Sequence, residues 1–211
     1  QETLKRGKTA LFLVPEIALT PQLLRIFAAH FGEQVAVLHS SLRAGERYDE
    51  WKRIRRGEAP VVIGTRSAVF APLSNLGLVI LDEEQEASYK SENNPRYHAR
   101  EVAKYRCVQE NALLLLGSAT PSVETMYAAQ SGSYRCFTLR QRYNQKALPQ
   151  VHIVDMKEEL RAGNGTSISR ALRQELEENL VRGEQAILFL NRRGASRMVS
   201  CGECGHVPEC P

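Results

Sequence analysis

Three carboxylates and an amide, Asp82-Glu83-Glu84-Gln85, follow directly after the uninterrupted apolar run Leu78–Leu81. A buried parallel strand reads as such a run, and ligands of parallel sheets bind at the carboxyl ends of the strands. Carboxylates packed this densely repel one another unless a cation neutralises them, and Mg²⁺ carried by nucleotide phosphates is held through one or two carboxylates. The cluster therefore indicates phosphate chemistry with Mg²⁺. The simpler alternative is a strand that runs into a solvated acidic turn.

Polar groups close four other apolar runs in the same way. They are Val14-Pro15-Glu16, Gly64-Thr65-Arg66-Ser67, Gly117-Ser118-Ala119-Thr120 and Asn191-Arg192-Arg193-Gly194. Because the ends of parallel strands converge on one edge of a sheet, these clusters together predict a shared face for an anionic ligand.

The elements that must position these groups are strands and helices in alternation. Strands are expected at 10–14, 35–38, 60–64, 77–81 and 112–116, and helices at 21–31, 43–56, 98–110 and 121–130. Thr20-Pro21 and Thr120-Pro121 each offer an N-cap and a proline at the first helical position. After a polar linker the pattern restarts, with strands at 151–155 and 186–190, a Gly-Asn-Gly loop at 163–165 and a helix at 169–182. This alternation predicts an α/β fold, a parallel sheet with helices on both faces.

Composition sets the outer limits. The chain has 211 residues, 43% of them hydrophobic, and a formal net charge of +4, which suits one large domain plus part of a second and is compatible with nucleic acid. No apolar stretch approaches the ~20 residues that span a bilayer, and no signal peptide is visible. The odd count of five cysteines favours a reducing cytoplasm over a disulfide framework. A first residue Gln1 and a last residue directly after Cys210 indicate an internal fragment of a longer protein.

Five motifs make the pattern specific. They read Pro-Glu-Ile-Ala-Leu-Thr-Pro-Gln, Gly-Thr-Arg-Ser-Ala-Val-Phe-Ala-Pro, Asp-Glu-Glu-Gln, Gly-Ser-Ala-Thr-Pro-Ser and Phe-Leu-Asn-Arg-Arg-Gly. In order and spacing they resemble the motifs of superfamily 2 helicases, and most closely those of bacterial replication-restart DNA helicases, over essentially the whole chain. The resemblance implies a first RecA-like lobe at 1–139 without its phosphate-binding loop, a linker at 140–150, the start of a second RecA-like lobe at 151–200 and a truncated zinc-binding module at 201–211.

The same resemblance implies an activity and partners. The complete protein would be an ATP-dependent DNA helicase that uses Mg²⁺, acts on forked or single-stranded DNA and reloads the replication machinery. Primosome proteins and single-strand-binding proteins would be its partners, and no membrane is implied.

It also implies roles in hydrolysis. Asp82 would bind Mg²⁺, directly or through water, and Glu83 would orient the attacking water. Ser118 and Thr120 would couple the nucleotide state to the DNA track, although Thr120 also suits a plain N-cap. Gln85 stands where a histidine is more usual; its neutral amide can bind the next motif by hydrogen bonds but cannot titrate.

Other residues are expected on the DNA side. By resemblance these are Pro15, Glu16, Thr65, Arg66, Asn191, Arg192 and Arg193. Glu16 has the alternative of only accepting hydrogen bonds from loop amides.

Residues 89–106 interleave aromatic rings with cations, a pattern typical of stacking on single-stranded bases and of phosphate contacts. Tyr89, Arg96, Tyr97, His98 and Arg100 are the residues predicted to contact DNA. For Arg100, Lys104 and Tyr105 the alternative is a solvated helix surface.

Gly7-Lys8-Thr9 looks like the end of a phosphate-binding loop, but Glu2 occupies the position where that motif needs its first glycine. The tripeptide also runs into a strand rather than into a helix, so it is interpreted as a basic turn at a helix end. In the helicases that the chain resembles, the phosphate-binding loop lies upstream. The fragment alone is therefore expected not to hydrolyse ATP.

Cys201 and Cys204 have the Cys-x₂-Cys spacing, and Cys210 follows. Two such thiolates can hold one tetrahedral Zn²⁺, but a structural site needs four ligands. The resemblance implies two zinc sites, one shared by Cys201 and Cys204 and another begun by Cys210, both incomplete here. A redox Cys-x₂-Cys, and His206 as a further ligand, are the alternatives.

Two other functions stay open at this point. A non-catalytic module that binds nucleic acid or primosome proteins would keep the fold but use no nucleotide; the intact Asp-Glu-Glu and Gly-Ser-Ala-Thr clusters favour the enzyme. An RNA-remodelling enzyme of the same superfamily would share these strand ends, and the cysteine knuckle after Asn-Arg-Arg-Gly argues against it.

Overall fold

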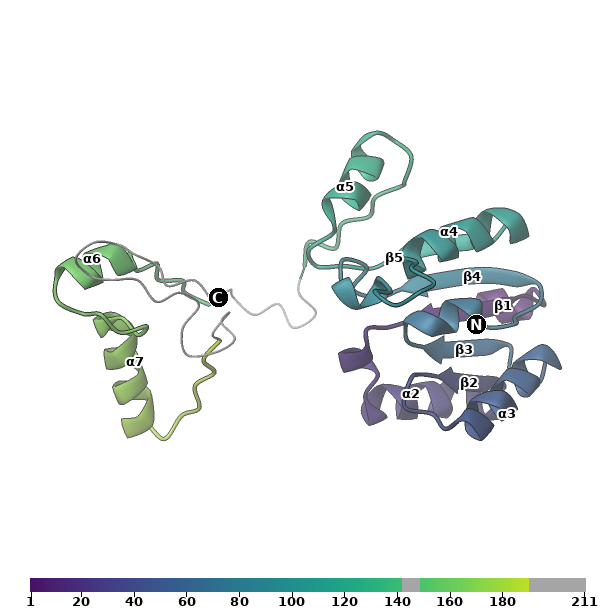
Figure 1. Ribbon diagram of the computed structural model, residues 1–211, viewed down its shortest axis with the longest axis horizontal. Helices are drawn as coiled ribbons and strands as arrows, with labels where there is room; N and C mark the ends of the chain where they lie inside the picture. Colours follow the sequence, from purple (N-terminus) through teal and green to yellow (C-terminus); the bar gives the residue numbers. More distant parts are fainter. Residues whose placement is uncertain (142–148, 190–211) are drawn as a thin grey trace, which may run out of the picture. The chain divides into compact units, whose positions relative to one another are not determined.

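The computed structural model describes residues 1–141 and 149–189 (Figure 1). The chain divides into two compact units between Thr138 and Leu139. The helices and strands of the first unit are α1 (Glu2–Lys5), β1 (Thr9–Leu13), α2 (Pro21–Phe31), β2 (Val35–Leu38), α3 (Ala44–Arg55), β3 (Val61–Gly64), β4 (Leu76–Leu81), α4 (Ala99–Glu110), β5 (Leu113–Leu116) and α5 (Val123–Gln130). Short 3₁₀ turns lie at η1 (Glu16–Ala18), η2 (Gly32–Gln34), η3 (Arg66–Phe70) and η4 (Ala87–Tyr89).

The five strands form one parallel sheet in the order β2-β3-β1-β4-β5 (Figure 1). Each predicted strand of this unit is found, with its ends within one residue of the prediction. The register places the last residues of the strands side by side: Leu38, Gly64, Leu13, Leu81 and Leu116. The polar residues that follow them therefore emerge along a common edge, as the sequence predicts.

One face of the sheet packs against α3 and α4; it is fully buried along β1 and only partly buried at Leu114 and Leu116 of β5. Leu11 and Leu13 have no exposed surface and belong to the same core cluster as Ile54 of α3 and Cys107 of α4. On the other face Phe12 of β1 stacks against Phe27 of α2, with ring centroids 5.2 Å apart. Right-handed crossovers produce this arrangement, because the chain moves one way along the sheet through α2 and the opposite way through α3 and α4.

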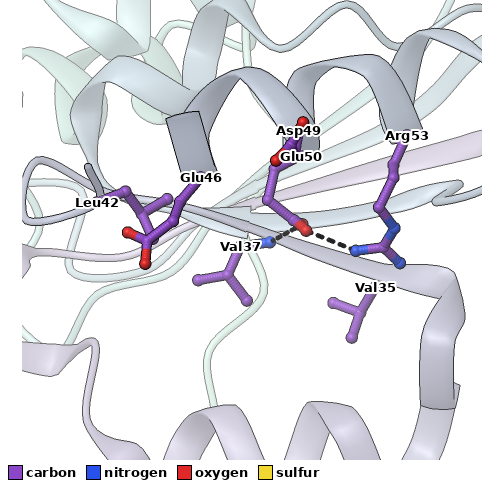
Figure 2. A pocket seen from close by; sticks show the side chains of 7 residues that line it. All are labelled: Val35, Val37, Leu42, Glu46, Asp49, Glu50 and Arg53. Carbon is purple, nitrogen blue, oxygen red and sulfur yellow. Dashed lines mark hydrogen bonds and ion pairs between the residues drawn. The ribbon is translucent and has the colours of Figure 1, made fainter. Parts of the chain in front are cut away.

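At the outer edge of the sheet, a side chain of α3 occupies the free edge of β2. Glu50 accepts a hydrogen bond from the Val37 amide (3.1 Å) and another from Arg53 (2.7 Å), as Figure 2 shows. A strand edge with free amides can pair with another chain, and this carboxylate occupies one such donor. None of the predicted site residues lines the hollow beside it.

The helix starts follow the predicted caps with one exception. Thr20 caps α2 and Pro21 is its first residue, as predicted. Helix α5 begins at Val123, and Ser122 accepts the capping hydrogen bond from the Thr125 amide at 3.3 Å. The prediction that Thr120 caps this helix is therefore wrong, because a second hydroxyl residue lies nearer the helical turn and takes the capping role.

The chain before β1 agrees with the interpretation of a basic turn. Helix α1 ends at Lys5, and Gly7 adopts a left-handed conformation (φ 68°) before the chain enters β1. A phosphate-binding loop would follow a strand and open a helix.

The described part of the second unit contains α6 (Met156–Arg161) and α7 (Arg170–Val181). Glu159 of α6 accepts hydrogen bonds from the side chain of Asn164 (2.7 Å) and the backbone amide of Arg170 (3.0 Å), so it fixes the turn between the helices. These contacts, led by the Asn164 hydrogen bond, lower the pKa of Glu159 to about 2. The predicted helix at 169–182 is confirmed, with Ser169 as its N-cap.

The two strands predicted for this unit are not confirmed. Residues 151–155 and 186–189 form no strand, and Ile153 and Ile187 are 93% and 97% exposed. An apolar run becomes a strand only beside a partner that pairs with its amide and carbonyl groups. Within the described residues neither run has one. No helix of the described chain is long and apolar enough to cross a bilayer.

Candidate active site at the strand ends

The turn after β4 is locked to the end of β1. The Asp82 amide donates to the Leu13 carbonyl (3.0 Å), and the Tyr89 hydroxyl lies 3.0 Å from that carbonyl and 2.7 Å from the carbonyl of Asp82. Tyr89 is fully buried, and burial raises its pKa. The prediction that Tyr89 contacts DNA is therefore wrong: its ring packs in the core and its hydroxyl serves two backbone carbonyls.

Glu83 has a left-handed backbone conformation, with φ of 47°. This conformation costs a residue other than glycine about 1–2 kcal/mol and is found disproportionately at functional sites. It turns the chain sharply after the strand, so that the next amide, of Glu84, donates to the carbonyl of Gly117 at 3.1 Å. The turns after β4 and β5 are thereby held against each other.

A relay of hydrogen bonds joins the side chains of these two turns. Gln85 donates from Nε2 to Glu83 Oε2 (2.8 Å), and its Oε1 accepts a hydrogen bond from the Ser118 hydroxyl (2.5 Å). The Ser118 oxygen in turn accepts from the Thr120 amide at 2.9 Å. The hydrogen bond expected between the neutral amide at position 85 and the next motif is therefore present, and its role in coupling stays a prediction. Thr120 enters this relay through its backbone.

Asp82 is half-buried beside this relay. Among the described residues, the only hydrogen bond to its carboxylate comes from the Glu83 amide, 3.2 Å from Oδ1. The described residues contain no group of three or more histidine, cysteine or acidic side chains suited to hold a metal ion. A single carboxylate with free acceptor capacity fits Mg²⁺, which keeps several waters and binds the phosphates of its nucleotide.

Glu84, between Glu83 and Gln85, was given no role by the sequence, yet its side chain is 1% exposed. Arg100 Nη1 lies 2.8 Å from its Oε2, and the Ser122 amide donates to its Oε1 at 2.7 Å. Burial opposes its charge, but these hydrogen bonds and those from the hydroxyls outweigh burial, so the pKa of Glu84 is lowered. The neighbouring residues Asp82, Glu83, Gln85 and Glu86 are all polar, so the sequence carries no local signal that this acid is buried.

Arg100 fits neither of its two predicted settings, a contact with DNA or a solvated helix surface. Its side chain is only 13% exposed, and Nη1 is also within hydrogen-bonding distance of Ser122 Oγ (2.7 Å) and Thr125 Oγ1 (3.1 Å). It is neither a solvated surface residue nor free to contact DNA, because its guanidinium neutralises the buried Glu84.

On the predicted DNA side, the structure separates buried from exposed residues. Thr65 is 2% exposed and Pro15 is also buried, so the prediction that their side chains contact DNA is not supported. Arg66 donates to the carbonyls of Ser88 (3.1 Å) and Lys90 (2.7 Å) and so braces the segment after η4. Glu16 is exposed and accepts a hydrogen bond from the Ser40 hydroxyl at 3.1 Å.

Residues 88–98 form a loop closed by backbone hydrogen bonds rather than one face of a helix. The Ser91 amide donates to the Tyr97 carbonyl (2.7 Å). The ring of Tyr97 packs edge-on against the ring of Phe70, with centroids 4.9 Å apart. Arg96 is exposed. His98 caps α4 by accepting from the Arg100 amide, and burial, followed by the nearby Arg100 charge, lowers its pKa.

The remaining predicted residues lie outside the described residues. These are Asn191, Arg192, Arg193, Cys201, Cys204, His206 and Cys210. The described residues contain two cysteines: Cys136 is exposed and Cys107 is buried, and burial raises the pKa of the Cys107 thiol to about 11.

Comparison with known proteins places this geometry in a family. The sequence model of the DEAD/DEAH box helicases matches residues 1–128. The chain belongs to the DEAD/DEAH box helicase family. Over its whole length, this chain is 52% identical to the replication restart protein PriA of Bacillus subtilis and 50% identical to that of Synechocystis. It spans 26% of the length of each, about a quarter.

Among solved structures, this chain is similar to RecG bound to a three-way DNA junction. The identity is 27%, the TM-score is 0.40, and the match covers 60% of this chain and 16% of RecG.

Proposed function

We propose that this chain is part of an ATP-dependent DNA helicase that acts in replication restart and primosome assembly. The observation that carries the proposal is the relay Glu83–Gln85–Ser118 beside Asp82, in a chain half identical to replication restart proteins. The relay connects an acidic turn to the next strand end by side-chain hydrogen bonds. A module that only binds nucleic acid or primosome proteins has no need of such a connection, so that alternative is not favoured.

In the proposed mechanism Asp82 would hold the Mg²⁺ of MgATP, and that ion would neutralise charge on the phosphates. Glu83 orients the attacking water: Gln85 occupies Oε2, and Oε1 receives no hydrogen bond from the described residues. Orientation is the main task of protein groups in phosphoryl transfer, because it fixes the line of attack. Ser118, held by Gln85, transmits the state of this site to the Gly117–Ser122 turn.

The proposed DNA contacts come from segment 88–98, above all the exposed Arg96 and the half-buried Tyr97, with the Asn191-Arg192-Arg193 motif. Arg66 supports them by bracing the backbone of the segment. Forked or single-stranded DNA would be the substrate, because neighbouring aromatic and cationic side chains suit bases and phosphates that are not fully paired.

The finer organisation is also a proposal. Residues 1–139 would be a RecA-like lobe, 140–150 a linker, 151–200 the start of a second such lobe and 201–211 part of a zinc-binding module in which Cys201, Cys204 and Cys210 are ligands. Primosome and single-strand-binding proteins would be partners, and the cytoplasm the place of action. These proposals rest on similarity to PriA proteins.

The choice of activating nucleic acid tests the proposal on the complete protein. We expect forked DNA to stimulate ATP hydrolysis in the presence of Mg²⁺, and RNA duplexes of the same sequence to do so far less. Equal stimulation by both would support an RNA-remodelling enzyme instead. No stimulation by either, with DNA binding intact, would support a non-catalytic module.

A further inference from the structure

The buried pair Glu84–Arg100 ties together three segments that are distant in sequence. Glu84 belongs to the turn after β4, Arg100 to the first turn of α4, and Ser122 to the start of α5. The Ser122 amide and the Arg100 guanidinium bind different oxygens of the same carboxylate, at 2.7 and 2.8 Å. A displacement of any one segment therefore changes contacts in the other two.

The pair lies directly beside the proposed hydrolysis relay. Glu84 is flanked in sequence by Glu83 and Gln85, and Ser122 ends the turn that carries Ser118. The Thr125 hydroxyl also donates to Glu84 Oε2 at 3.0 Å, so the first turn of α5 is held at two points. The Gly117–Ser122 turn is fixed between β5 and this anchor.

The pair is also connected to segment 88–98, through the start of α4. Arg100 lies two residues after His98, which ends that segment and caps α4 through the Arg100 amide at 3.2 Å. The antiparallel bridge between Lys90 and His98 closes the segment at the same point. A ligand that shifts the segment would therefore act first on the backbone that carries Arg100.

We propose that Glu84 and Arg100 are positioning residues that couple segment 88–98 to the relay of Glu83, Gln85 and Ser118. The inference deepens the proposed function and rests on it, because it concerns how DNA controls ATP hydrolysis. A buried ion pair is suited to this role: loss of either partner leaves an uncompensated buried charge, so the three segments keep one shared arrangement or change together.

The test uses the complete protein with Glu84→Gln, Arg100→Met and the double variant. Arg106→Met is the matched control, because Arg106 lies on the same helix, is similarly buried and also pairs with a glutamate, but its hydrogen bonds among the described residues go to Val69, Ala71 and Glu110 and not to the Gly117–Ser122 turn. The readout is the ratio of ATP hydrolysis rates with and without forked DNA, measured below the melting temperature of every variant.

We expect this ratio to fall by roughly 2- to 30-fold in both single variants, the range typical of residues that carry coupling between sites. The double variant should be no worse than either single variant, because the two side chains act through one contact. Arg106→Met should keep the wild-type ratio. Arg100→Lys, which keeps the charge, should restore part of the stimulation and serves as the second variant where Arg100→Met does not fold.

Hydrogen exchange on the same proteins gives a readout independent of turnover. Exchange at the 117–125 segment should be faster in Glu84→Gln and Arg100→Met and unchanged in Arg106→Met. A wild-type stimulation ratio in both single variants, or an equal loss in Arg106→Met, overturns the inference and leaves the proposed function standing. Absence of DNA stimulation in the wild-type protein overturns both.

Discussion

The Ser118 hydroxyl donates a hydrogen bond to the side-chain oxygen of Gln85 across 2.5 Å, although the two residues are 33 positions apart in sequence. The contact exists because β4 and β5 are neighbours whose last residues, Leu81 and Leu116, stand in register. The other end of the same amide holds Glu83. One neutral side chain thus connects the proposed water-orienting carboxylate to the next strand end.

Replacing this amide tests the connection. We expect Gln85→Leu to lower the rate of DNA unwinding about tenfold more than the rate of ATP hydrolysis. The reason is the lost hydrogen bond to the charged Glu83, since hydrogen bonds to charged groups contribute roughly 1.5–3 kcal/mol. Parallel measurement of both rates on forked DNA gives the ratio. An equal loss in the two rates would show that Gln85 serves hydrolysis alone. Gln109→Leu, on the exposed surface of α4, is the control.

The lowered pKa of Glu84 predicts how stability depends on pH. A carboxyl whose folded-state pKa lies below its ordinary value of 4.5 stabilises the fold fully above that pH. This stabilisation is lost as the pH falls from 4.5 through the lower folded-state pKa. The melting temperature of the wild-type protein should therefore decline in this window, and Glu84→Gln should lack that part of the decline. Identical pH profiles would contradict the buried charge.

Tyr89 should behave as a core residue. Tyr89→Phe removes the hydroxyl that donates to the carbonyls of Leu13 and Asp82. The Leu13 carbonyl keeps the Asp82 amide, but the Asp82 carbonyl loses its donor, and a buried group left without a partner costs about 1–3 kcal/mol. Denaturant unfolding should show this loss, with no change in DNA affinity. Tyr105→Phe, at a 67% exposed position of α4, should change neither quantity. Weaker DNA binding by stable Tyr89→Phe would restore the original prediction.

Arg96, in contrast to Tyr89, should affect DNA binding and not stability. Its side chain is exposed, so Arg96→Ala should raise the DNA concentration needed for half-maximal ATPase stimulation and leave the melting temperature unchanged. The dependence of DNA affinity on salt should also weaken, because each phosphate contact releases counterions. Lys104→Ala, an exposed cation of α4, is the control. Unchanged stimulation in Arg96→Ala would remove segment 88–98 from the DNA-binding surface.

The strands of the first unit and their shared edge could be predicted from sequence because buried parallel strands are continuous apolar runs with abrupt polar ends. The relay at Gln85 could be foreseen for the same reason, since neighbouring strand ends must meet. The runs at 151–155 and 186–189 show the limit of this argument. An apolar run is a necessary condition for a strand, and pairing, which the run itself does not reveal, is the other.

Side-chain direction around the turns could not be predicted. The left-handed conformation of Glu83 sets how the turn leaves β4, and Glu84 is buried while the residues on either side are half-buried. The partners of Glu84 lie 16 and 38 positions away in sequence, so no local pattern distinguishes this acid from its neighbours. For the same reason Arg100 and Tyr89 resembled surface residues in the basic and aromatic run.

ATP hydrolysis by the complete protein carrying Glu83→Gln tests most directly whether the strand end after β4 is the active site. The substitution keeps the shape of the side chain but removes the carboxylate proposed to orient water. DNA-stimulated hydrolysis should fall by about 100-fold or more, the scale of a lost catalytic acid–base or positioning group, with DNA binding intact. Glu86→Gln, the same chemical change three residues on, should retain wild-type hydrolysis. Retention of hydrolysis by Glu83→Gln would contradict the assignment of this strand end as the active site.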